Sequence, residues 1–156
     1  MKSIYKLIIS IAIPLAVGGV AGYFTSSSVN TWFVTLNKPS FNPPSWVFAP
    51  VWTTLYIMMG ISFYIIWNSH AKLEKRYTGY IYYWLQLALN FMWSFLFFYF
   101  QRPDLALIDI ILLFIMIAST IFSFRKISKT AAWLLVPYLC WVTFATALNF
   151  EIWRLN

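Results

Sequence analysis

The chain has 156 residues, of which 62% are hydrophobic and only 10% are charged. A soluble domain of this length cannot bury so much apolar surface, so the composition excludes an ordinary soluble protein and indicates a membrane protein. The formal net charge of +7 does not indicate nucleic-acid binding, because the basic residues lie in short clusters between apolar runs.

Five apolar segments are each long enough to cross a bilayer as a helix, which takes about 20 residues. The sequence therefore predicts an all-α membrane protein, a five-transmembrane-helix bundle forming one domain over residues 1–156. The expected spans are residues 4–24, 45–67, 80–100, 105–124 and 131–153. Lys2 and Lys6 near the start of the first apolar run resemble the basic region of a signal peptide. The length of the run and the lack of a small-residue cleavage site favour a retained helix.

The first span contains Pro14, where we expect a kink, and the pair Gly18 and Gly22. Two small residues four positions apart allow another backbone to approach closely. The sequence leaves open whether that backbone belongs to the same chain or to a second copy.

A polar loop of residues 25–44 follows and leads into the stretch KPSFNPPSWVFAPVWTTLYIMMG, residues 38–60. Its prolines remove backbone donors and fix φ, so we expect a stiff, extended lid that becomes helical only at about Ser45, with Pro50 in the first turns. Trp32 and Phe33 indicate that the loop folds back onto the protein.

Three spans each carry large side chains at helical spacing on one face. The faces comprise Trp52, Tyr56, Met59 and Phe63; then Gln86, Asn90, Trp93 and Phe97; then Trp141, Ala145 and Leu148. Such stripes are more often helix packing than a binding site. Three aromatic faces below a stiff lid nevertheless predict a flat-walled slot for a planar apolar ligand.

Polar groups within the spans allow two interpretations. Gln86, Asn90 and Asn149 are either interhelical hydrogen-bonding residues or ligand contacts, and packing is the favoured role for Gln86. Asp109 is either an intramembrane proton site or a carboxylate stabilised near the start of its helix, and we favour the second.

Known catalytic and metal-binding patterns do not emerge from the sequence. The four carboxylates do not pair at helical spacing, and one cysteine with one histidine cannot build a Cys/His metal cluster or an internal disulfide. We therefore expect no metal site and no tightly bound cofactor.

Eight of the eleven Lys and Arg residues lie at the N-terminus and in the second and fourth loops. The positive-inside rule then predicts a multi-pass protein of the cell membrane, with its N-terminus cytoplasmic and its lid and C-terminus outside.

The chain resembles the TspO/MBR family, the tryptophan-rich sensory proteins and translocator proteins once called peripheral benzodiazepine receptors. The resemblance rests on three blocks: WFVTLNKPSFNPPSWVFAPVWTTLYIMMG at residues 32–60, QLALNFMWSFLFF at 86–98 and PYLCWVTFATALNFEIWRLN at 137–156. It implies a five-helix bundle, usually a homodimer, that binds porphyrins such as protoporphyrin IX, haem-related tetrapyrroles and drug-like benzodiazepine or isoquinoline carboxamide ligands. The low charge and the many Ile and Lys residues are compatible with a bacterial member.

The resemblance also implies a ligand site and an activity. The site residues would be Phe48, Ala49, Trp52, Tyr56, Asn90, Trp93, Trp141, Ala145 and Leu148. Bacterial relatives are associated with light- and oxygen-dependent degradation of protoporphyrin, which would make Trp52 and Trp141 catalytic here. The alternative is a transporter or regulatory sensor that binds tetrapyrroles without altering them, and a third possibility is a scaffold whose aromatic residues only pack.

One departure from the family concerns sterols. The cholesterol motif L-x-Y-x-R is represented by Leu148, Phe150 and Arg154, with phenylalanine in place of tyrosine. This substitution argues against cholesterol as the ligand and favours a tetrapyrrole.

Overall fold

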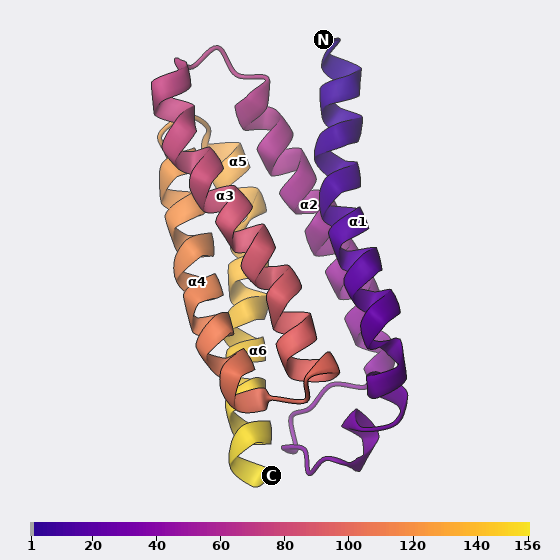
Figure 1. Ribbon diagram of the computed structural model, residues 1–156. Helices are drawn as coiled ribbons and strands as arrows, with labels where there is room; N and C mark the ends of the chain where they lie inside the picture. Colours follow the sequence, from indigo (N-terminus) through magenta and orange to yellow (C-terminus); the bar gives the residue numbers. More distant parts are fainter. Residues whose placement is uncertain (1) are drawn as a thin grey trace.

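The computed structural model describes residues 2–156 and is a bundle of long helices (Figure 1). In chain order the elements are α1 (Ser3–Asn30), η1 (Phe33–Thr35), η2 (Ser45–Val47), α2 (Phe48–Trp67), α3 (Leu73–Ser94), η3 (Phe95–Tyr99), α4 (Pro103–Arg125), α5 (Lys129–Leu134) and α6 (Val136–Leu155). Within residues 2–156 they form five segments long and apolar enough to cross a membrane, which confirms the predicted all-α five-helix fold. The two ends of the chain lie at opposite ends of the bundle.

Two of the predicted boundaries are wrong. Residues 25–30, expected to begin the loop, continue α1, because their polar side chains bond within the helix: Thr25 Oγ1 donates to Ala21 O at 2.8 Å and Asn30 Nδ2 to Ser26 O at 3.0 Å. The third helix begins at Leu73 rather than Tyr80, since its charged first turns extend beyond the apolar segment. The lid is therefore residues 31–44.

Two irregular turns shape the later spans. Phe95–Tyr99 forms a single π-helical turn, closed by a 2.8 Å bond from Phe100 N to Phe95 O, and Gln101 follows with a φ of 55°. Pro137 lacks an N–H, and the fifth span breaks at Leu135 into α5 and α6. As expected, Pro50 lies in the first turn of α2, where a missing donor is least costly.

Helices α1 and α2 approach each other through a glycine. A Cβ atom built on Gly60 would lie 2.6 Å from both Ile11 Cα and Ser10 O, so the two backbones are in direct contact there. A Cβ atom on Gly18 would meet the ring of Tyr56, whereas one on Gly22 would have no neighbour within 4 Å, so only the first glycine of the pair packs closely within the chain. These contacts fix the position of α1 along α2.

A chain of buried hydrogen bonds joins α2, α3 and α6. Tyr56 Oη donates to Asn90 Oδ1 at 2.7 Å, Asn90 Nδ2 donates to Tyr138 Oη at 2.7 Å, and Tyr138 Oη donates to Gln86 Oε1 at 2.8 Å. Gln86 Nε2 also faces Met59 Sδ at 3.7 Å. The favoured packing role of Gln86 is therefore confirmed, and these bonds set the relative positions of three helices.

The lid folds back onto the bundle, as the sequence predicts. Phe33 lies 5.6 Å from Phe98 and 6.2 Å from Phe97, measured between ring centroids, and Phe41 lies 6.1 Å from Phe144 of α6. The side of the lid that faces the bundle is therefore aromatic.

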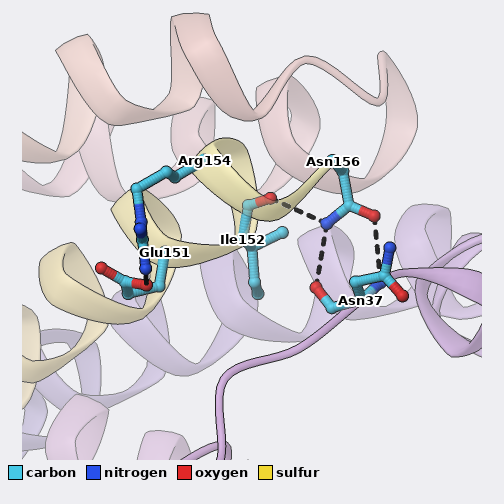
Figure 2. A network of polar contacts seen from close by, with 5 residues as sticks. All are labelled: Asn37, Glu151, Ile152, Arg154 and Asn156. Atoms are coloured by element: carbon cyan, nitrogen blue, oxygen red, sulfur yellow. Dashed lines mark hydrogen bonds and ion pairs between the residues drawn. The ribbon is translucent and has the colours of Figure 1, made fainter.

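An asparagine pair fastens the lid to the end of α6 (Figure 2). Asn37 N donates to Asn156 Oδ1 at 2.9 Å, and Asn156 Nδ2 donates to Asn37 O at 2.9 Å. The same Nδ2 donates to Ile152 O at 2.8 Å, which orients the amide. The Asn156 side chain thus pairs with both the N–H and the C=O group of Asn37, as the backbone of a neighbouring β-strand would.

We expect Gly60→Ala to lower the free energy of unfolding in detergent by about 1–3 kcal/mol, because the new methyl group meets backbone atoms that cannot move aside without separating α1 from α2. Gly19→Ala is the matched control, since a Cβ there has no neighbour within 4 Å. Equal stability of the two variants in thermal unfolding would contradict the proposed backbone contact.

We expect Asn156→Ala to raise the amide hydrogen exchange rate of residues 31–44 by roughly three- to tenfold, because each lost hydrogen bond contributes about 0.5–1.5 kcal/mol. Glu151→Gln is the control: it breaks the neighbouring 2.6 Å ion pair with Arg154, which does not touch the lid (Figure 2). Unchanged exchange in Asn156→Ala would show that the asparagine pair does not hold the lid.

Candidate ligand-binding site

A cavity of about 530 Å³ lies under the lid, between α1, α2, the end of α3 and α6. This volume is within the range of pockets that hold small organic ligands. Of the residues expected at the ligand site, those that line it are Phe48, Ala49, Trp52, Tyr56, Trp93, Trp141, Ala145 and Leu148. Parts of all three faces predicted from helical spacing therefore meet in one space, whereas Met59, Phe63 and Gln86 of those faces do not line it.

Trp52 forms one wall and is held by two tyrosines. Its ring stacks on Tyr56 with centroids 5.6 Å apart and planes 30° apart, and it meets Tyr138 edge-on at 6.3 Å. Both tyrosine hydroxyl groups bond to Asn90. The indole of Trp52 is thus positioned by rings that are themselves fixed by hydrogen bonds.

Trp93 and Trp141 differ in their hydrogen bonding. Trp93 Nε1 donates to Asn149 Oδ1 at 3.0 Å, and Asn149 Nδ2 donates to Pro103 O at 2.9 Å. Trp141 packs edge-on against Phe48 at 6.0 Å, and its buried Nε1 has no hydrogen-bond partner among residues 2–156. Because this Nε1 is buried, it does not face the open space of the cavity, although Trp141 lines it.

Asn90 is the one expected site residue that does not line the cavity. It is 3% exposed, and both ends of its amide are occupied by Tyr56 and Tyr138. Helical spacing predicts which face Asn90 is on but not which group its amide bonds to. In this structure Asn90 positions Tyr56, and Tyr56 lines the cavity.

Sequence reasoning missed the contribution of α1. Its small residues form a smooth wall, and Gly19 and Gly22 have no atom within 4 Å of where a Cβ would stand. The same small residues had suggested only helix packing. The π-helical turn η3 adds Phe97 and Phe98, and the lid adds Phe33.

Asp109 and most of the sterol motif lie outside the cavity. Asp109 is 6% exposed in the second turn of α4 and does not line the cavity. Leu148 lines the cavity, whereas Phe150 is exposed and Arg154 is paired with Glu151 at 2.6 Å. The motif residues therefore do not form one surface.

Comparison with known proteins gives a consistent result. Residues 10–154 match the model of the TspO/MBR family. The tryptophan-rich protein TspO of Chlorobaculum tepidum is 45% identical over 99% of this chain and 98% of its own length. The translocator protein of Bos taurus is 38% identical over 90% of this chain and 85% of its own, and the tryptophan-rich sensory protein of Cereibacter sphaeroides is 40% identical over 80% and 77%. The chain belongs to the TspO/MBR family.

Proposed function

We propose that this protein binds protoporphyrin IX or a related tetrapyrrole in the cavity under the lid and promotes its light- and oxygen-dependent degradation. The observation that carries the proposal is that Trp52 and Trp141, from α2 and α6, line one cavity. Relatives named for sensing or translocation support a ligand-binding role in the membrane.

The walls of the cavity suit a flat, apolar ligand. Aromatic rings contribute large contact areas and stack against planar molecules. The same features support binding of isoquinoline carboxamide and benzodiazepine-type molecules. The Phe150 substitution and the divided sterol motif argue against cholesterol.

The proposed chemistry uses light and dissolved oxygen rather than an acid and a base. Dioxygen is the oxidant and is reduced, and the porphyrin ring is oxidised. Indole is readily oxidised, so Trp52 and Trp141 would exchange an electron with the excited porphyrin stacked beside them. The lid would keep the reactants together in an enclosed, apolar space.

We expect protoporphyrin to quench indole fluorescence of the purified protein, and illumination in air to convert the bound porphyrin. Trp52→Phe and Trp141→Phe should each slow conversion by about tenfold or more while retaining most of the binding, because phenylalanine keeps an aromatic wall but is not readily oxidised. Trp153→Phe, an exposed tryptophan outside the cavity, should behave like the native protein.

Conversion at the native rate in both cavity variants would disprove the role of the tryptophans. Binding without light-dependent conversion would instead favour the alternative, a transporter or sensor that passes tetrapyrroles on unchanged. Flux of labelled porphyrin into proteoliposomes in the dark measures that activity directly. Failure to bind any planar ligand would leave a scaffold as the explanation.

We also propose that the lid and the C-terminus face the outside of the cell membrane and that the protein is a homodimer, as the family resemblance implies. Eight of the eleven Lys and Arg residues are at the end of the bundle opposite the lid, which supports this orientation. A reporter fused to the C-terminus should be active only outside the cytoplasm. Activity only inside would reverse the proposed orientation.

A further inference from the structure

A second, smaller hollow lies between α1, α2 and α3 at the end of the bundle away from the lid. Its volume is about 160 Å³, and its walls are apolar, with Ile9, Ile13, Phe63 and Trp84 among them. Ile9 and Trp84 are 37% and 42% exposed, so the hollow is open to the bilayer. It is too small for a drug-sized ligand but has room for part of a lipid acyl chain.

The wall of the groove is apolar even where a serine lies in it. Ser10 lines the groove at 3% exposure, and its Oγ is buried, without a hydrogen-bond partner among residues 2–156. The groove therefore offers an occupant apolar contacts, and any polar contact must come from residues beside it.

Two basic side chains lie beside the groove. Lys6 Nζ lies 5.7 Å from the ring centroid of Trp67, and Arg76 Nη1 donates to Trp67 O at 3.0 Å and faces Tyr80 Oη at 3.4 Å. Trp67 and Tyr80 both line the groove. Neither cation has a carboxylate partner within residues 2–156. Their positive charge is therefore available to an anion.

The depths of these groups match a phospholipid. Lys6 precedes Ser10 by four residues of α1, a rise of about 6 Å, so the cation is nearer the membrane surface and the hydroxyl group is nearer the hydrocarbon. Basic pockets between transmembrane helices are known to bind acidic lipid headgroups. An apolar groove alone would accept any lipid, whereas the two unpaired cations favour an anionic one.

We propose that this groove is a binding site for an anionic phospholipid. One acyl chain lies against Ile9, Ile13 and Phe63, and Lys6 and Arg76 contact the headgroup phosphate. The site shares no lining residue with the cavity under the lid and does not depend on the function proposed for that cavity.

Native mass spectrometry of the full chain in detergent, with equal amounts of dioleoyl phosphatidylglycerol and dioleoyl phosphatidylcholine, tests the charge. The native protein should retain phosphatidylglycerol preferentially, and Lys6→Gln with Arg76→Gln should lower this retention by about tenfold. The control is Lys72→Gln with Lys75→Gln, which removes two exposed cations from the same end of the bundle. An equal loss in the control, or no preference in the native protein, would overturn the proposal.

Ser10→Leu tests the groove itself, because leucine fills the hollow without changing the charge. Retention of both lipids should fall, while quenching by protoporphyrin in the other cavity stays at the native level and reports that the fold is intact. If the double variant Lys6→Gln with Arg76→Gln folds poorly, Lys6→Gln alone replaces it in the charge test, since Lys6 makes no side-chain hydrogen bond within residues 2–156. Native lipid retention in Ser10→Leu would exclude the groove as the site.

Discussion

The amide of Asn90 is the contact on which the wall of the large cavity depends. It binds the hydroxyl groups of Tyr56 and Tyr138, which come from α2 and α6, and both rings pack against Trp52. In an apolar interior such hydrogen bonds are directional, whereas packing of aliphatic side chains is not. The position of one polar group therefore fixes three aromatic rings on two other helices.

The wall and the lid of the cavity are held in place by different kinds of interaction. Its wall is held by buried hydrogen bonds and stacked rings, whereas the lid is fastened at Asn37 and Asn156 by exposed hydrogen bonds that compete with water. Segments with exposed polar contacts open at a lower free energy than packed cores. The lid thus has exposed polar contacts at Asn37 and Asn156 in addition to the aromatic packing of Phe33 and Phe41, whereas the polar contacts of the wall are buried.

The length of the apolar segments predicted the five spans, and helical periodicity predicted the three aromatic faces, because a 3.6-residue repeat reports directly which side chains share a face. It did not predict the partner of Asn90, since spacing does not specify what an amide bonds to across helices. The glycines of α1 were read as packing residues, because a small residue looks the same in sequence whether it meets a helix or a cavity. The polar residues 25–30 were read as loop, although their side chains bond back to the helix.

The contact between α1 and α2 separates the two hollows of the bundle. Gly60 brings α2 against Ser10 and Ile11, while the large cavity begins at Leu15 of α1 and the groove ends at Ile13. Because backbone meets backbone there, no side-chain rotation can join the two spaces. Passage of a large planar molecule along the length of the bundle would require the two helices to part. The contact between α1 and α2 therefore keeps the cavity under the lid and the groove at the far end as separate spaces in this fold.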